Sequence, residues 1–127
     1  MAITLSTDAR NAAADAIAGL VDAGAGPNGQ MLIKTAGAVV VATIDLQATA
    51  FAAAVGGSAV ALGVPLQDPS AAATGVASTF DIVDKDGTVI FSGTVTISGG
   101  GGDAIIDDVN IAAGNVVQLD ALSITVP

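Results

Sequence analysis

The aspartates are the side chains in this sequence whose type and spacing could do chemistry. The 127-residue chain has no His, Cys, Tyr or Trp, and its only cations are Arg10, Lys34 and Lys85. It therefore lacks the usual general base near neutral pH, the thiolate nucleophile and the soft metal ligands. Any catalysis would have to rest on Asp, Ser and Thr, and we predict that the protein is not an enzyme.

Two groups of aspartates carry the oxygen ligands that Ca²⁺ prefers. Asp81 and residues 84–87 (DKDG) resemble the start of a calcium loop, but no bidentate Glu follows. We interpret them as a hairpin turn with solvated acids. Asp103, Asp107 and Asp108 could hold a calcium ion between chains, although a solvated edge explains them more simply. We predict no catalytic residue, no metal site and no cofactor.

Two further kinds of chemistry have weaker support. Residues 98–103 (SGGGGD) lack the Lys-Ser or Lys-Thr of a phosphate-binding loop, and no helix follows them. We interpret the run as a flexible connector. Paired carboxylates could hydrolyse glycosides, but no Trp, Tyr or His is present to hold a sugar.

Charge and hydropathy exclude two classes of partner. The net charge of −9 argues against nucleic acid, whose binding depends on Lys and Arg. The mean hydropathy is +0.75, and the longest uncharged run is residues 46–67, called here the apolar segment. It is mostly Ala, Gly and Val and has no basic or aromatic flanks, so we expect no membrane span. Residues 1–5 lack the basic residue of a secretory signal, which predicts synthesis in the cytosol without processing.

Elements must position any site, and the first expected element is a helix. Ser6, Thr7 and Asp8 are typical of a helix N-terminus, and the glycines and proline of residues 24–27 end the pattern. The helical spacing assigns these residues to the apolar face: Ala9, Ala13, Ala16, Ile17, Leu20 and Val21.

Residues 76–97 form the expected centre of the fold, a β-hairpin around the turn at residues 84–87. Gly87 suits the left-handed position of such a turn. Period-2 alternation assigns these apolar residues to the inner faces: Val76, Phe80, Ile82, Val89, Phe91, Val95 and Ile97. We predict that Phe80 and Phe91 are buried in the core.

Other strands are expected at residues 30–35, 39–46, 104–107 and 116–126. The first two should form a second hairpin, and a phase change near residues 120–122 predicts a bulge in the last strand, which Pro127 ends. Alanine and glycine leave residues 46–66 undecided between helix and strand.

The predicted fold is mainly β. About six to eight short strands after one N-terminal helix indicate a β-sandwich-like domain. We expect a single structural domain over residues 1–127, with an N-terminal arm and helix (1–26) and a β domain (27–127).

The excess of alanine and valine predicts an interface, because exposed apolar patches usually mark one. The alternative is a plain Ala-rich domain. We expect the apolar segment to be ordered by contact with a sister copy or another protein. Its candidate partner-interface residues are Phe51, Val55, Val60, Leu62, Val64 and Leu66.

Several stretches, in their order and spacing, resemble a known family: residues 1–10 (MAITLSTDAR), 20–24 (LVDAG), 43–46 (TIDL) with Phe51, 82–89 (IVDKDGTV) and 122–127 (LSITVP). The family comprises small virion structural proteins of tailed bacteriophages, described as head decoration or capsid cement proteins. The resemblance implies a non-enzymatic protein that binds the outside of the capsid in many copies and strengthens the shell.

The implied partners are the major capsid protein and copies of the protein itself, as in a trimer. The implied location is the capsid surface of the virion, after synthesis in the host cytoplasm. The alternative function is a tail- or fibre-associated module that binds host glycans.

Overall fold

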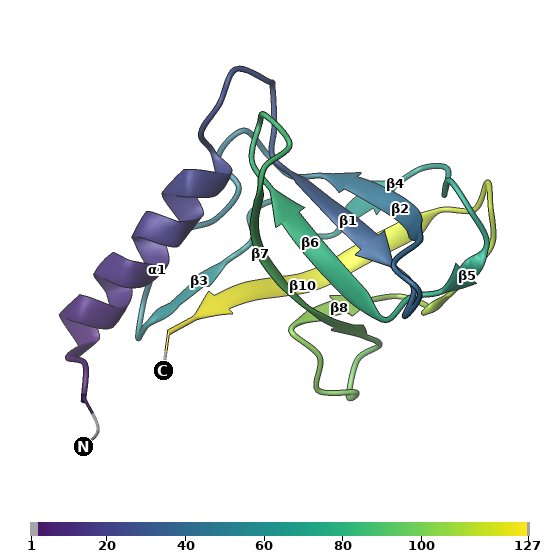
Figure 1. Ribbon diagram of the computed structural model, residues 1–127. Coiled ribbons are helices and arrows are strands. Elements are labelled where there is room, and N and C mark those ends of the chain that lie inside the picture. Colours follow the sequence, from purple (N-terminus) through teal and green to yellow (C-terminus); the bar gives the residue numbers. More distant parts are fainter. Residues whose placement is uncertain (1–2, 127) are drawn as a thin grey trace.

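The protein is mainly β, with one helix at its N-terminal end (Figure 1). The computed structural model describes residues 3–126, in which a helix precedes ten strands. In chain order these are α1 (Thr7–Val21), β1 (Gln30–Lys34), β2 (Val40–Asp45), β3 (Ser58–Val60), β4 (Leu66–Asp68), β5 (Gly75–Val76), β6 (Thr79–Val83), β7 (Val89–Thr96), β8 (Ala104–Ile106), β9 (Asn110–Ile111) and β10 (Val117–Thr125). The expected β-sandwich-like class with one N-terminal helix is confirmed. Met1 and Ala2 of the expected arm, and Pro127 at the end of the last strand, lie outside the described residues.

Eight of the strands in the described residues form one curled sheet. Its order is β2-β1-β6-β7-β8-β10-β3, with β4 also paired to β10. The sheet curls so that β4, which is paired with β10 near one end of this order, contacts β2 at the other end. The buried Asp68 carboxylate joins these two strands, since its Oδ2 accepts from the Thr43 N–H (2.9 Å) and its Oδ1 from the Ser70 N–H (3.0 Å). Asp68 is therefore a buried structural acid at the end of β4.

Both predicted hairpins are present. β1 pairs with β2 and β6 with β7, all antiparallel. In the β6–β7 turn, Asp84 Oδ1 accepts from the N–H groups of Asp86 and Thr88 (both 2.9 Å), and Gly87 has φ 88°. The bulge predicted near residues 120–122 is confirmed by a register shift of β10 against β8 between Leu119 and Ala121.

The inner faces of the β6–β7 hairpin differ in part from the predicted alternation. Val76 belongs to β5, which pairs with β9, and it is exposed, as are Val89 and Ile97. Val89 lies beyond the point where the register of β6 on β7 shifts after Ile82, and Ile97 follows the last residue of β7. The glycine at position 93 has a packing role, since a Cβ there would lie 2.8 Å from the Phe80 ring.

Helix α1 begins and ends where the sequence predicts. Ser6 is the N-cap, and its Oγ accepts from the Ala9 N–H (3.1 Å). The predicted buried face is wrong for most of its members, because the helix turns Ala14, Ala18 and Val21 inward. Of the predicted face only Val21 is fully buried and Ala13 and Ile17 are half-buried, whereas Ala9, Ala16 and Leu20 are exposed. Alanine is so frequent in this helix that several faces fit the same spacing.

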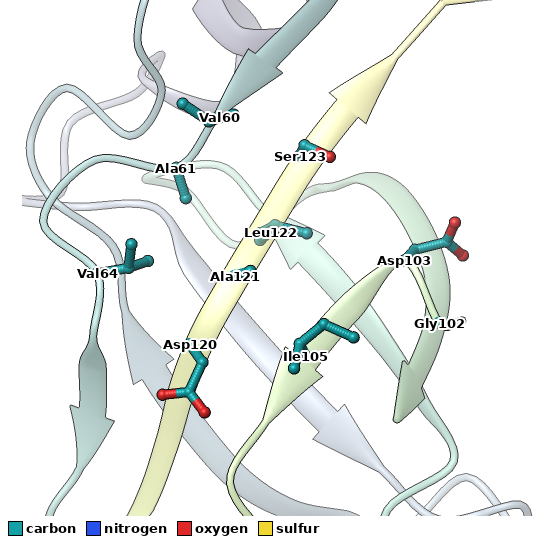
Figure 2. A pocket seen from close by; sticks show the side chains of 10 residues that line it. All are labelled: Val60, Ala61, Val64, Gly102, Asp103, Ile105, Asp120, Ala121, Leu122 and Ser123. Atoms are coloured by element: carbon teal, nitrogen blue, oxygen red, sulfur yellow. The ribbon is translucent and has the colours of Figure 1, made fainter. Parts of the chain in front are cut away.

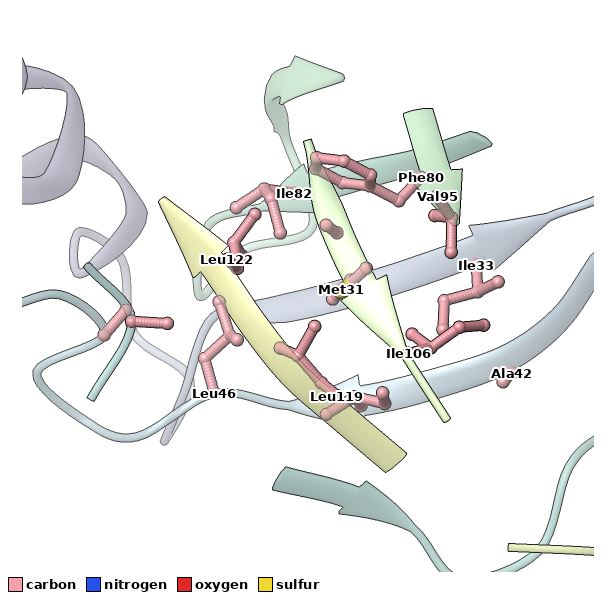
Figure 3. Packing of buried hydrophobic residues seen from close by; sticks show 14 of the residues in the cluster. Met31, Ile33, Ala42, Leu46, Phe80, Ile82, Val95, Ile106, Leu119 and Leu122 are labelled. Carbon is pink, nitrogen blue, oxygen red and sulfur yellow. The ribbon is translucent and has the colours of Figure 1, made fainter. Parts of the chain in front are cut away.

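One hydrophobic core lies inside the curl of the sheet and extends under α1 (Figure 3). Its largest side chains include Met31, Ile33, Phe80, Ile82 and Leu119. The three phenylalanines form a row, with ring centroids 6.1 Å apart for Phe80 and Phe91 and 6.3 Å apart for Phe51 and Phe91. Phe80 is buried as predicted, but Phe91 is only half-buried.

Candidate partner-binding surface

The apolar segment is ordered within this chain, which corrects the expectation that contact with a partner would order it. It contains β3 and the first residues of β4, and the isolated bridges Phe51–Ala61 and Val55–Ser58 join its parts. The Ala52 N–H donates to the Val60 carbonyl (2.8 Å), and the Leu62 N–H donates to the Ala50 carbonyl (2.9 Å).

Side chains of α1 bind the same segment through its backbone. Asn11 Oδ1 accepts from the Gly57 N–H (2.7 Å), Asp15 Oδ1 from the Ala54 N–H (2.7 Å) and Asp22 Oδ1 from the Ala50 N–H (2.9 Å). Asn11 and Asp15 lie on one stripe of the helix, and the C-cap residue Asp22 continues it, because residues four and seven apart share a face. They satisfy backbone donors that have no strand partner, which explains how a segment without a clear pattern acquires one path.

The six predicted interface residues fall into three structural groups. Phe51 is 4% exposed and belongs to the core, so its side chain is not accessible to a partner. Leu62 and Leu66 are half-buried. Val55, Val60 and Val64 are 79%, 53% and 37% exposed, which leaves three candidates with apolar surface in water.

Two of those candidates line an open groove across β10, called here the β10 groove (Figure 2). Val60, Ala61 and Val64 come from one side, Ile105 of β8 from the other, and Ala121 lies between them. The groove has a volume of about 400 Å³. Val55 is not among its lining residues, so the structure brings Val60 and Val64 together and leaves Val55 apart.

Two carboxylates flank this apolar surface. Asp120 lies at one end of the groove and accepts from the Gln118 Nε2 (2.6 Å), while Asp103 lies on the β8 side and accepts from the Thr94 N–H (3.0 Å). Both residues are exposed, so each carboxylate retains oxygen lone pairs for a donor in solution. The groove therefore combines apolar walls with negative charge.

The sequence pattern assigns Asp103 to a solvated edge, but it does not single out Ile105 as a surface residue. For Asp120 and Ala121 the signal is the phase change in the last strand. The bulge turns the consecutive residues Asp120 and Ala121 both outward, where a regular strand would have buried one of them. A bulge predicted from sequence can therefore mark a place where a strand presents two neighbouring side chains.

The remaining aspartates of the two candidate calcium groups bind protein groups. Lys34 forms an ion pair with Asp81, and the Ser92 hydroxyl also donates to it (2.6 Å). The hydrogen bond from Lys34, and to a smaller extent that from Ser92, holds the pKa of the Asp81 carboxyl below its ordinary value. Asp107 Oδ1 accepts from the N–H groups of Asp108 (3.0 Å) and Gln118 (3.1 Å). Within residues 3–126, no group of three or more acidic side chains is arranged to hold a metal ion.

The glycine connector is anchored at the ends of the strands it joins. It links β7 to β8, which run parallel, and the Gly102 N–H donates to Thr96 Oγ1 (2.9 Å). Asp103 Oδ2 accepts from both the N–H and the hydroxyl of Thr94 (3.0 and 3.2 Å). These contacts hold the end of the connector, residues 102 and 103, against β7, whereas residues 98–101 are exposed.

Comparison with known proteins adds no functional assignment. The chain matches no protein-family model, no curated protein and no solved structure. No helix in the described part of the chain has both the length and the apolar character needed to cross a membrane.

Proposed function

We propose that this protein is a non-enzymatic virion structural protein that binds the outer surface of a phage capsid in many copies and stabilises the shell. The observation that supports this most is the β10 groove, an exposed apolar surface with a carboxylate at its end and another at its side. Its proposed partner is the major capsid protein, through an apolar side chain that enters the groove next to a Lys or Arg.

The amount of exposed apolar surface fits binding in many copies. A groove of about 400 Å³ takes only a few side chains, so one copy alone is expected to bind weakly. Copies that also touch each other, for example as a trimer, would add their contacts and bind the particle much more tightly than a single domain. Self-association on the particle is therefore part of the proposal.

The test is co-sedimentation of purified variants with undecorated capsids. Val60→Asp places a charge in the apolar wall of the groove. Burial of a polar group without a partner costs about 1–3 kcal/mol, so binding should weaken about fivefold to a hundredfold. Val116→Asp is the matched control, because Val116 is 52% exposed against 53% for Val60 but lies outside the groove.

Both variants must keep the melting temperature of the parent protein for the comparison to hold. Equal binding of the two variants at parental strength would remove the groove from the interface. Binding by neither the parent protein nor any variant would contradict capsid binding itself. Labelling of intact particles separates this function from the alternative one, since label at the tail tip would favour a glycan-binding tail module.

A further inference from the structure

The curled sheet has a gap between β7 and β10. Both strands flank β8 at one level, where Val95 pairs with Ala104 and Ala104 pairs with Leu122 (Figure 1). β8 begins at Ala104, but β7 and β10 both continue past that point. The space between them is called here the slot, with a volume of about 210 Å³, and it is lined by Ile17, Phe80, Phe91, Ser92, Asp103, Ser123, Ile124 and Thr125.

At the β8 end, the slot has the width of one strand. Neighbouring strands lie about 4.8 Å apart, so two strands on either side of a third are roughly 9.6 Å apart. β7 and β10 have that separation where β8 lies between them, and residues from both line the slot beyond its end. An added strand would continue the line of β8 and complete the sheet.

The β7 edge directs backbone groups into the slot. The Val95 N–H donates to the Ser78 carbonyl on the β6 side (3.0 Å), whereas the Thr94 N–H points the other way and donates to Asp103 (3.0 Å). Alternate residues of a strand present their N–H and C=O groups to the same edge. Ser92, two residues before Thr94, therefore presents its N–H and C=O to the slot.

The edge of β10 also directs backbone groups into the slot. The Leu122 carbonyl accepts from the Ala61 N–H (2.9 Å), so Leu122 points toward the β3 side. Ser123 and Thr125 stand one and three residues further along and thus point into the slot. In residues 3–126, no backbone hydrogen bond joins this part of β10 to β7. Two open strand edges of this kind are a template for a third strand.

The lining of the slot defines the side chains that an occupant needs. Ile17, Phe80, Phe91 and Ile124 supply apolar surface, and the half-buried state of Phe91 is explained by the open slot beside it. The polar residues among the lining are Ser92, Asp103, Ser123 and Thr125. Successive side chains of a strand point to opposite faces, so the occupant needs an apolar residue between polar ones.

Charge indicates that the occupant is not another copy of this chain. Asp103 lies at the end of the slot, and the protein carries a net charge of −9 with only three cations. Lys34 is paired with Asp81 and Arg10 is bound to the Thr7 hydroxyl (3.2 Å), which leaves Lys85 in the β6–β7 turn as the one other cation. A second copy would bring mostly negative charge, whereas a basic segment of a different protein would complement the slot.

We propose that the slot binds an extended segment of a different protein as an added strand, with one apolar side chain on the core and a Lys or Arg beside Asp103. This goes beyond the proposed function and does not depend on it, because the slot would accept such a strand from any partner. The groove and the slot share Asp103 and Ser123 as lining residues, so one partner could contact both.

The test uses the full chain and a synthetic probe. The probe is a hexapeptide whose terminal residues are lysines and whose four inner residues alternate between valine and threonine. Its binding is monitored in the amide spectrum of the protein and by hydrogen exchange. We expect the backbone amides of Ser92, Ser123 and Thr125 to shift on titration. Their exchange should slow about tenfold at a peptide concentration ten times the dissociation constant.

Two control peptides distinguish strand addition from binding by charge attraction alone or by non-specific hydrophobic contact. The same peptide with N-methylated backbone amides cannot form the ladder, and it should bind at least tenfold more weakly. A version with glutamate in place of both lysines should bind several-fold more weakly at low salt. Equal binding of the N-methylated peptide, or shifts confined to residues outside the slot, would overturn the proposal.

A protein variant provides an independent measurement. Ile17→Trp fills the slot from α1 and should reduce peptide affinity at least tenfold. Leu20→Trp is the matched control, because Leu20 lies on the same helix, is 54% exposed and does not line the slot. Unaltered binding by a folded Ile17→Trp protein would overturn the location. Protection of Ser92 and Thr125 that rises with protein concentration without peptide would show that a second copy fills the slot, which would overturn the choice of partner.

Discussion

The β6–β7 hairpin and the apolar segment are both rich in apolar residues, but they are held in place by different forces. In the hairpin, large side chains such as Phe80 and Ile82 pack into the core on a backbone ladder that is regular from Thr79 to Ile82. The apolar segment contributes mainly small side chains, such as Ala59 and Ala61, and has only short strands. Its path depends on carboxylate and amide oxygens from α1 and on Asp68 at its far end.

The difference shows that burial of large side chains fixes one region, whereas hydrogen bonds from other parts of the chain fix the other. A phenylalanine removes far more apolar area from water than an alanine, so a few large residues stabilise and also specify the hairpin. A run of Ala and Gly buries little area per residue and loses much backbone entropy on folding. Hydrogen bonds from elsewhere in the chain must then select one conformation.

The largest effect is expected in the hairpin. Phe80 is 1% exposed, and Phe80→Ala should lower the free energy of unfolding by about 3–5 kcal/mol, as for other large core aromatics. Phe91→Ala should cost roughly half as much, because the half-buried ring is partly hydrated already. Denaturant unfolding of both variants measures the difference. Equal losses would mean that Phe91 is as buried as Phe80 and that the slot beside it is closed.

The next largest effect is expected at the anchor between β2 and β4. Asp68→Ala leaves the Thr43 and Ser70 N–H groups without their acceptor, which should cost about 2–3 kcal/mol. Asp68→Asn should lose less, since the amide oxygen still accepts one of these bonds. Asp45→Ala is the control, because it removes only an exposed side-chain hydrogen bond from Gln30 and should cost less, about 0.5–1 kcal/mol. A control as damaging as Asp68→Ala would argue against this special role.

A smaller effect is expected where α1 anchors the apolar segment. Asp22→Ala removes the acceptor for the Ala50 N–H and should cost about 1–2 kcal/mol. Its local signature is faster hydrogen exchange at Ala50, whereas Asp15→Ala should accelerate exchange at Ala54. If both substitutions accelerate the same amides equally, the anchors act only through the stability of the helix.

The smallest effect is expected at the Lys34–Asp81 ion pair on the outer face of the sheet. Lys34→Met should cost about 1 kcal/mol or less at neutral pH, because the pair is partly exposed. The pKa of Asp81 is lower in the folded than in the unfolded protein. The stabilisation is therefore complete above the unfolded pKa and is lost as the pH falls through the folded pKa.

Unfolding curves of Lys34→Met and the parent protein at neutral and acidic pH measure this dependence. The difference in stability between them should shrink as the pH falls through the folded pKa of Asp81. A difference that stays constant into strong acid would assign the loss to packing of the lysine stem.

Much of the fold could be predicted from sequence where local signals are strong. Gly87 occupies the left-handed position that the turn demands, and Ser6 caps the helix as its type and position indicate. The bulge near Ala121 followed from a phase change in the apolar pattern. In each case the responsible interaction lies within a few residues of the signal, so the local sequence carries the information.

The candidate site could be predicted only in part. The apolar segment contributes Val60 and Val64 to the β10 groove, but Phe51 of the same segment is a core residue. Hydrophobicity alone cannot separate a residue buried in its own domain from one that is exposed. Apart from Ala61, the other groove residues come from β8, the connector that precedes it and β10, and only strand pairing brings them beside Val60.

The sequence by itself determined the mainly β character, the helix position, the hairpins and the acidic, cation-poor surface, because periodicity, caps, turns and charge are local properties. Only the tertiary structure decided the path of residues 46–67, the closure by Asp68, and the places of the β10 groove and the slot. Alanine and glycine fit many conformations, so their arrangement depends on hydrogen-bond acceptors far away in the chain. The slot exists because β8 is shorter than the strands on either side of it, and that relation appears only once the three strands are paired.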